Sequence, residues 1–245
     1  MNYISHIGQY FIMWKDIFRK MTKYSVLRSL IVQEINDLGV RSVGIIVFIS
    51  LFIGAVITIQ TALNFSNPLI DNSLIGFAAR QSIILEFSPT LISIIMAGKV
   101  GSYITSSIGT MRVTEQIDAL EVMGINSLNY LVFPKIVAMF IYPFLIAISM
   151  FVGIVGAYLT GVYGGFLSAE QFFTGLREDF IPFQMVYAFI KSLVFAMVLA
   201  TVPSYHGYYM KGGALEVGKA ATTSFVWTSI VIIVSNYLIT QLLLS

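Results

Sequence analysis

The chain has 245 residues, of which 57% are hydrophobic and only 11% are charged, and its formal net charge at pH 7 is +2. A soluble domain carries about 25% charged residues, so this composition predicts a membrane protein with several spans. The small net charge does not indicate a nucleic-acid-binding protein, and the lack of cysteine excludes disulfides, thiolate metal sites and a cysteine nucleophile.

Residues 1–41 have an amphipathic pattern and do not form a continuous apolar run. Apolar side chains such as Phe11 and Trp14 are interleaved with basic ones such as Lys15 and Arg19. A helix of this kind lies in the headgroup region of a bilayer, with tryptophan at the interface. We therefore expect an interfacial helix here, and a loose basic tail is the alternative.

Five apolar stretches follow, each long enough for the about 20 residues that a bilayer core requires. The predicted spans are Ser42–Leu63, Leu74–Met96, a long crossing within Leu128–Phe166, Pro182–Val202 and Thr223–Leu244, with a short turn at Asn64–Ser73. The third stretch is too long for one upright helix and too short for two. A single bent crossing puts the acidic loop 167–181 outside and Lys211 and Lys219 inside, as the positive-inside rule requires. The N-terminus is then cytoplasmic and the C-terminus lies on the other side.

Three charged side chains fall within the predicted spans, namely Arg80, Glu86 and Lys191. A charge at the bilayer centre costs roughly 2.5–3.5 kcal/mol on insertion scales, so each should face protein or water. We expect Arg80 near the outer interface and Lys191 either snorkelling or paired with an acid. Glu86 lies deeper, where it contacts lipid headgroup, water or a partner chain, or else serves as a hydrogen-bonded packing residue.

Small residues recur at every fourth position of the third apolar stretch: Ser149, Gly153, Ala157, Gly161 and Gly165. Such a ladder predicts that another helix approaches it closely.

The sequence contains no recognisable catalytic constellation, and we expect no catalytic residue, metal or cofactor. The two histidines, His6 and His206, lie on different segments, and neither HExxH nor GxSxG occurs. Gly213–Lys219 matches a phosphate-binding loop, but Ala220 stands where Ser or Thr would bind magnesium, and no strand precedes it. We interpret it as a glycine turn before the last span.

The stretch Gly98–Gly124 interrupts the spans and becomes polar at Thr110–Glu121. A helical wheel puts two groups of side chains on opposite faces: the apolar Val113, Ile117 and Leu120, and the acidic Glu115 and Asp118. Gly124 stands where a C-cap glycine would end the helix. A cytoplasmic amphipathic helix of this kind either enters a groove of a soluble partner or is a solvated connector.

Several segments together resemble the MlaE (YrbE) permease family: Ala97–Gly101, Gly109–Leu120, Met123–Ile125, Glu86–Pro89, Pro134-Lys135 and Gly212–Thr223. The likeness covers nearly the whole chain beyond the amphipathic N-terminus. It implies one permease domain, 1–245, with an interfacial helix region at 1–41 and a transmembrane region at 42–245. The expected fold is all-α and polytopic, with five transmembrane helices and a cytoplasmic coupling helix between the second and third.

The resemblance implies the permease subunit of an ABC transporter that moves phospholipids between the inner and outer membranes of diderm bacteria, maintaining outer-membrane lipid asymmetry. Family members are homodimers in the inner membrane, with a cytoplasmic N-terminus and a periplasmic C-terminus. They bind two copies of a cytoplasmic ATPase and work with a periplasmic lipid-binding MCE-domain protein, so the permease itself is not an enzyme. The alternatives are an ion-driven secondary transporter, which predicts paired intramembrane charges and inverted repeats, and a membrane scaffold without transport.

The resemblance also carries two sets of residues onto this chain. The coupling helix corresponds to Thr110–Met123, with Ile117 and Leu120 as apolar anchors among the contacts Thr110, Arg112, Val113, Glu115, Gln116, Ile117, Asp118, Leu120 and Met123. The lipid cavity, at the dimer interface, corresponds to Ile53, Ile57, Gln60 and Thr61 of the first span, together with Glu86. Where the family often has arginine before this glutamate, the chain has Leu85, which puts a fixed ion pair at Glu86 in doubt.

Overall fold

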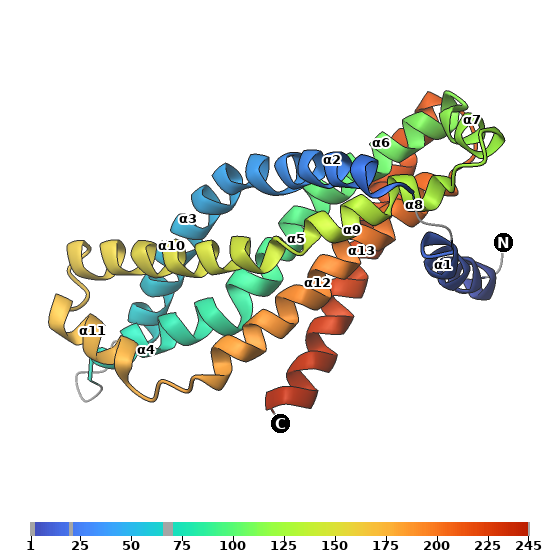
Figure 1. The fold of residues 1–245 in the computed structure, drawn as a ribbon. Coiled ribbons are helices and arrows are strands. Elements are labelled where there is room, and N and C mark those ends of the chain that lie inside the picture. The colour runs from blue at the N-terminus through green and yellow to red at the C-terminus, as the bar shows by residue number, and fades with distance from the viewer. Residues whose placement is uncertain (1–2, 20–21, 66–70, 245) are drawn as a thin grey trace. The chain divides into compact units, whose positions relative to one another are not determined.

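A computed structural model describes residues 3–19, 22–65 and 71–244, and all regular secondary structure in these ranges is helical (Figure 1). Five helical runs are long and apolar enough to cross a membrane: Tyr24–Asn64, Ser73–Val113, Ser127–Tyr163, Phe183–Tyr208 and Ala214–Leu243. The predicted all-α fold with five spans is confirmed. The predicted turn at Asn64–Ser73 falls largely outside the described residues.

The runs consist of helices joined end to end, several through short π-helical or 3-10 turns. In chain order the elements are α1 (Tyr3–Ile17), α2 (Tyr24–Glu34), η1 (Ile35–Gly39), η2 (Val40–Ser42), α3 (Val43–Asn64), α4 (Ser73–Ser82), η3 (Ile83–Leu91), α5 (Ile92–Met96), η4 (Ala97–Gly101), α6 (Ser102–Val113), α7 (Gln116–Val122), α8 (Ser127–Leu131), α9 (Phe133–Met139), α10 (Tyr142–Tyr163), α11 (Ala169–Arg177), α12 (Phe183–Tyr208) and α13 (Ala214–Leu244).

The chain forms two compact units, each built from three separated segments. Unit 1 comprises Met1–Arg41, Ile94–Ile141 and Val194–Ser235, and unit 2 comprises Ser42–Ser93, Tyr142–Leu193 and Asn236–Ser245. The long helices α12 and α13 therefore contribute residues to both units. The single permease domain implied by the family resemblance stays a prediction.

In unit 2, α3 and α10 pack with their backbones in close contact. A Cβ added at Gly54 would lie 1.9 Å from the Gly153 carbonyl oxygen, and one at Gly156 would lie 2.1 Å from the Leu51 carbonyl oxygen. Both distances are too short for any side chain, so only glycine fits there. The small-residue ladder on α10 thus meets α3, although its last member, Gly165, lies beyond the end of α10.

Arg80 on α4 is buried in unit 2 and binds the C-terminal end of α11. Its guanidinium donates to the carbonyl oxygens of Leu176, at 2.7 Å, and Glu178, at 2.9 Å. The last carbonyls of a helix lack intrahelical donors, so this cation satisfies them and complements the helix dipole. Helix α11, which lies beside α4 in Figure 1, occupies the segment that we predicted to be a loop at 167–181.

In unit 1, the N-terminal helix α1 is fixed to its own chain. Met13 and Ile17 are fully buried, and Asn126 and Asn129 donate to the carbonyl oxygens of Asp16 and Ile17 at 2.7 and 2.8 Å. Other apolar side chains of α1 are exposed, including Ile7, Phe11 and Ile12. This pattern suits a helix that packs on protein along one side and meets lipid along another, and its position in the interface stays a prediction.

Helix α2 packs against α9 in the same unit. Lys135 on α9 forms an ion pair with Glu34 on α2, and its side chain is only 4% exposed. Because a buried charge is costly unless paired, this contact fixes which face of α2 meets α9.

The third predicted span corresponds to one candidate membrane-spanning run, and this run is interrupted near its start. The run from Ser127 to Tyr163 breaks twice, between α8 and α9 and between α9 and α10, each time just before a proline. Pro134 and Pro143 explain both breaks, since proline lacks the N–H that would continue the preceding helix and is tolerated in the first turn of the next one, where each of them lies.

Candidate functional site

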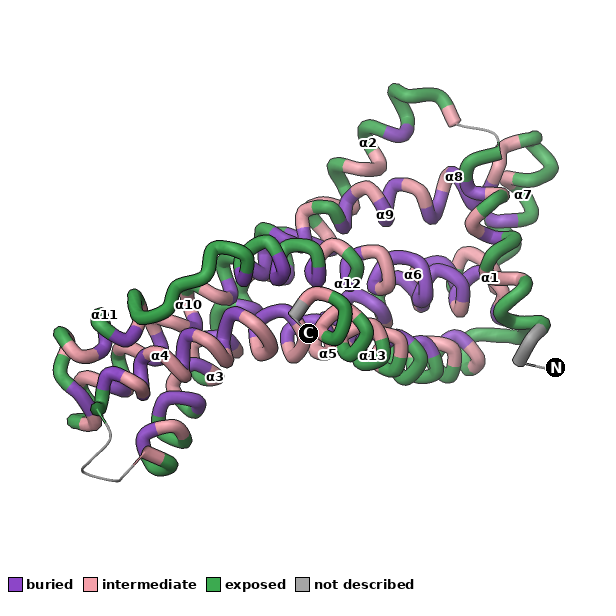
Figure 2. Tube along the Cα trace, turned by 90° about the horizontal axis from the view of Figure 1, so that it is seen from below, coloured by how far each residue is buried: buried purple, intermediate pink, exposed green. Residues whose placement is uncertain are grey.

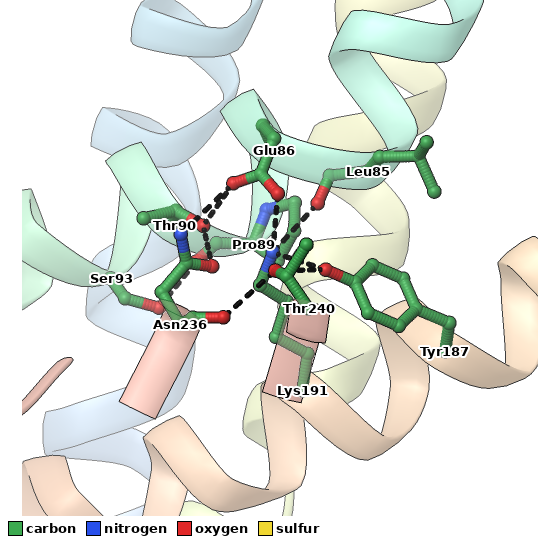
Figure 3. A network of polar contacts seen from close by, with 9 residues as sticks. All are labelled: Leu85, Glu86, Pro89, Thr90, Ser93, Tyr187, Lys191, Asn236 and Thr240. Carbon is green, nitrogen blue, oxygen red and sulfur yellow. Dashed lines mark hydrogen bonds and ion pairs between the residues drawn. The ribbon is translucent and has the colours of Figure 1, made fainter. Parts of the chain in front are cut away.

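A network of polar side chains links three helical segments of unit 2 (Figure 3). Each segment supplies a pair four residues apart: Glu86 and Thr90 on η3, Tyr187 and Lys191 on α12, and Asn236 and Thr240 on α13. Residues with this spacing lie on one face of a helix, so each segment presents two polar groups to the same place.

Lys191 is the centre of the network, and its side chain is 0% exposed. Its ammonium group donates to the Glu86 carboxylate at 2.9 Å, the Leu85 carbonyl oxygen at 2.9 Å and the Tyr187 hydroxyl at 2.8 Å. All three of its N–H donors are thereby used. The prediction that Lys191 pairs with an acid, as one of two alternatives, is confirmed.

Glu86 is held through both of its carboxylate oxygens. One accepts from Lys191, and the other lies 3.1 Å from the Asn236 amide nitrogen and 3.2 Å from the Thr90 hydroxyl. The doubt that Leu85 raised about an ion pair at Glu86 is therefore corrected, because the cation comes from another helix. The Glu86 side chain is nevertheless 43% exposed, whereas its partner is sealed.

Lys191 also donates to a backbone oxygen of the same segment. The accepting carbonyl belongs to Leu85, directly before Glu86, in the π-helical stretch that contains Pro89. Two successive residues of η3 thus bind the same lysine.

The hydroxyls extend the network to the backbone of α13. The Tyr187 hydroxyl lies 2.7 Å from that of Thr240, which donates to the Asn236 carbonyl oxygen. Tyr187 therefore accepts from Lys191 and donates to Thr240. The arrangement is overall neutral, satisfies each charge and leaves one partly exposed carboxylate able to meet a polar group outside the chain.

Of the three charged residues that the sequence placed within spans, the structure brings Glu86 and Lys191 together. The other side chains of the network were not predicted, namely Thr90, Tyr187, Asn236 and Thr240. A signal for them exists, since each lies four positions from another polar residue within an otherwise apolar span. Such isolated pairs in membrane helices are candidates for interhelical hydrogen bonds.

The four residues proposed on the first span differ in their surroundings. Ile57 is 6% exposed and belongs to the apolar core of unit 2, so it does not line an open surface within this chain. Gln60 is exposed, Ile53 and Thr61 are half-buried, and the Thr61 hydroxyl bonds to the Ile57 carbonyl. The surface of α3 instead presents large apolar side chains, among them Phe48, Phe52, Val56 and Leu63.

The predicted helix Thr110–Glu121 is wrong as a single element. Thr110, Arg112 and Val113 belong to the last turn of α6, which ends there, and α7 begins only at Gln116. Glu115 between them has φ of +58°, a left-handed conformation that no helix continues through. The predicted end is correct, because Gly124 has φ of +72° and donates to the Glu121 carbonyl while Ile125 donates to that of Leu120, a Schellman motif.

Helix α7 is mostly exposed, with one buried position (Figure 2). That position is Ile117, which is 0% exposed and anchors α7 to unit 1, so it cannot anchor a partner in this structure. Leu120 is half-buried, and the free apolar side chains are Val122, 89% exposed, and Met123, 65% exposed. The central residue of the predicted apolar face thus packs on this chain, and the contact of the segment with an ATPase stays a prediction.

One ion pair and two hydrogen bonds orient α7. Asp118 pairs with Arg112 on α6 at 2.9 Å, and Glu121 accepts from the Ser127 and Tyr208 hydroxyls, each at 3.0 Å. Glu115 and Gln116 are exposed. Of the three acidic side chains, Asp118 and Glu121 therefore hold α7 in place, whereas Glu115 faces solvent.

The phosphate-loop-like sequence is part of a helix. Residues from Ala214 onward belong to α13, and Gly212, with φ of +114°, makes the turn that precedes it. In a phosphate loop the backbone curves around the anion before the helix begins, whereas here the helix begins directly after Gly213. The glycine-turn interpretation therefore holds only for the start of the stretch, and the rest of it is helical.

Comparison with known proteins decides the family. The model of the family described as Permease MlaE matches residues 31–242. The chain belongs to the MlaE permease family. A permease role in an ABC transporter follows from this membership, and with the five spans it makes the chain a multi-pass membrane protein.

Three relatives illustrate the breadth of the family. A probable ABC transporter permease protein of Rickettsia bellii is 37% identical over 215 residues, covering 87% of this chain and 83% of that one. One from Synechocystis is 32% identical over 240 residues, covering 95% and 89%. The chloroplastic protein TRIGALACTOSYLDIACYLGLYCEROL 1 of Arabidopsis thaliana is 30% identical over 212 residues, covering 85% of this chain and 60% of that protein.

Proposed function

We propose that this MlaE-family chain is the permease subunit of an ABC transporter that moves phospholipids between the inner and outer membranes of a diderm bacterium, and so maintains outer-membrane lipid asymmetry. The family match over residues 31–242 carries the proposal. The plant relative, whose name contains that of a diacylglycerol lipid, supports a lipid as the substrate class. On this proposal the chain lies in the inner membrane with its N-terminus cytoplasmic and its C-terminus periplasmic.

The proposed assembly is a homodimer with two cytoplasmic ATPase subunits and a periplasmic MCE-domain protein. Lipid enters a cavity at the dimer interface to which α3 contributes Gln60 and Thr61, and Ile53 and Ile57 support that surface from behind. Many apolar side chains along α3 and α13 are exposed in the single chain. Such surfaces favour contact with protein or lipid, which supports a second copy of the chain as their partner.

The segment Thr110–Met123 is proposed to receive the motion of the ATPase. The structure supports this role, because the seven-residue helix α7 is held to the chain by the buried Ile117, by one ion pair to α6 and by the hydrogen bonds of Glu121. In the refined assignment, Val122 and Met123 enter the groove of the ATPase, with Glu115 and Gln116 at its rim. Leu120 is half-buried, and the exposed part of its side chain contributes to the same contact with the ATPase.

We expect Val122→Asp together with Met123→Asp to abolish co-purification of the ATPase with the permease. Truncating a buried anchor at an interface commonly costs more than about 1–2 kcal/mol, and placing a charge there costs more. The measurement is the ATPase-to-permease ratio after affinity purification in mild detergent. Tyr163→Asp is the matched control, since Tyr163 is 80% exposed and is the last residue of α10, in unit 2. Wild-type recovery of the ATPase with the double variant would remove α7 from the interface.

One observation favours the second candidate, an ion-driven secondary transporter. Such a protein uses paired intramembrane charges, and Glu86 and Lys191 form such a pair. However, Glu86 already accepts three hydrogen bonds, and its charge is balanced by Lys191, so it is a poor cation site. Transport that follows an ion gradient and needs no ATP would support the second candidate and exclude the first.

A further inference from the structure

Two adjoining cavities lie in unit 1, where the end of α12, the start of α13 and helix α1 meet. One has a volume of about 480 Å³ and the other about 340 Å³. They share the side chains of His6, Tyr205, His206 and Thr223, so each opens beside the other. Neither contains any residue of the polar network around Lys191 or of α7.

The larger cavity is mostly apolar. Its walls include Ile7 of α1, Val202 of α12, and Trp227 and Val231 of α13. Ile7 is 58% exposed and Trp227 is 41% exposed, so the apolar lining can be reached from outside the chain. An open apolar cavity at the end of membrane spans is accessible to lipid acyl chains.

The smaller cavity carries the cationic side chains. It is lined by Lys211 and Lys219, and Glu216 is the one acid in its lining. Lys219 pairs with Glu216 at 2.6 Å, which leaves the charge of Lys211 uncompensated within this lining. Tyr209 adds a neutral donor here, because burial raises the pKa of its phenol and the Asp16 carboxylate raises it further.

The boundary between the cavities carries aromatic side chains. The Tyr205 ring packs against those of His6, Tyr10 and Tyr209. Tyrosine and tryptophan gather at the level of the lipid headgroups, where one end of each ring is apolar and the other is wet. The order of apolar cavity, aromatic boundary and cationic cavity matches the order of parts in a phospholipid.

We propose that this pair of cavities binds an anionic phospholipid of the surrounding bilayer, with an acyl chain beside Trp227 and the headgroup phosphate at Lys211 and Lys219. The site is separate from the proposed transport cavity, and it requires only that α12 and α13 span the membrane. A lipid bound here would join α1 to the two spans. Basic residues near a membrane surface attract anionic lipids, and the cavity confines that attraction to one place.

The chain allows a direct test because it contains only two tryptophans, Trp14 and Trp227. In Trp14→Phe, Trp227 is the sole tryptophan, and its fluorescence is quenched when a brominated acyl chain touches it. The full-length variant is placed in phosphatidylcholine nanodiscs that contain increasing fractions of brominated phosphatidylglycerol or, in parallel, brominated phosphatidylcholine. We expect half-maximal quenching at an about fivefold lower fraction of the anionic lipid, the effect of about one lysine at a membrane surface.

The same titration is repeated with Lys211→Gln/Lys219→Gln added, and with Lys23→Gln, outside both cavities, as the matched control. The preference for the anionic lipid should vanish in the double variant and persist in the control, while quenching by brominated phosphatidylcholine stays the same in all three. Equal quenching by both lipids in the parent overturns the proposal, and so does a preference that survives the double substitution. Relief of quenching by millimolar inorganic phosphate would assign the cationic cavity to a soluble anion and also overturn it.

Discussion

Replacing Glu86 with leucine is expected to destabilise the permease by about 3–5 kcal/mol, the cost of leaving a buried charge without its partner. The lysine that remains is 0% exposed, so water cannot take the place of the lost carboxylate. The Leu85 carbonyl and the Tyr187 hydroxyl would still accept from it, but neither carries a charge. The midpoint of thermal unfolding in mild detergent is the measurement.

The reverse substitution should cost less. In Lys191→Met the remaining carboxylate is 43% exposed and keeps Thr90 and Asn236 as donors, so it can be hydrated. We expect a loss of about 1–2 kcal/mol, typical of a partly satisfied polar group. The double variant Glu86→Leu/Lys191→Met should recover much of the stability lost in Glu86→Leu alone, because apolar pairs often replace buried ion pairs without loss. Equal losses in both single variants, or no recovery in the double, would show that the pair does not behave as a coupled buried unit.

Gly54→Ala is expected to destabilise the protein by roughly 3 kcal/mol although it adds a single methyl group. That methyl would lie 1.9 Å from the Gly153 carbonyl oxygen, so α3 and α10 must separate. Separation would also break the hydrogen bond between the Ser50 and Ser149 hydroxyls, which is 2.8 Å long. Folded yield and the unfolding midpoint both report the effect.

Gly44→Ala is the matched control for this change. Gly44 lies on the same helix, and a Cβ there meets nothing within 4 Å. Alanine favours a helix over glycine by up to about 1 kcal/mol, so this variant should be as stable as the parent or slightly more so. If the two alanine variants unfold at the same midpoint, the α3–α10 contact is looser than the structure shows.

The features that sequence predicted well are those set by hydropathy and by glycine. Span positions follow from the length of each apolar run, and Gly124 ends α7 because a left-handed residue is needed there. The small residues on α10 predicted a close contact with another helix, but they did not indicate that this helix is α3. That choice depends on Gly54 meeting Gly153, a match between two distant segments.

The errors arose where one pattern is compatible with two partners. A helical wheel shows that Ile117 is on an apolar face, but not whether that face meets the chain itself or another protein. In the same way, the sequence shows Glu86 and Lys191 as two isolated charges, because they are 105 positions apart. They meet only when η3 packs on α12 in the folded chain. The break at Glu115 has no signal in hydropathy at all.

The central claim is tested most directly by ATP-dependent lipid movement in a reconstituted system. The permease and its ATPase are placed in vesicles that contain a fluorescent phospholipid, with the MCE-domain protein as the soluble partner, and transfer of the lipid between vesicle and protein is followed with and without ATP. We predict transfer that requires ATP and ceases with a hydrolysis-deficient ATPase. Lipid transfer at the same rate without ATP, or ATP hydrolysis with no lipid transfer, would contradict the account.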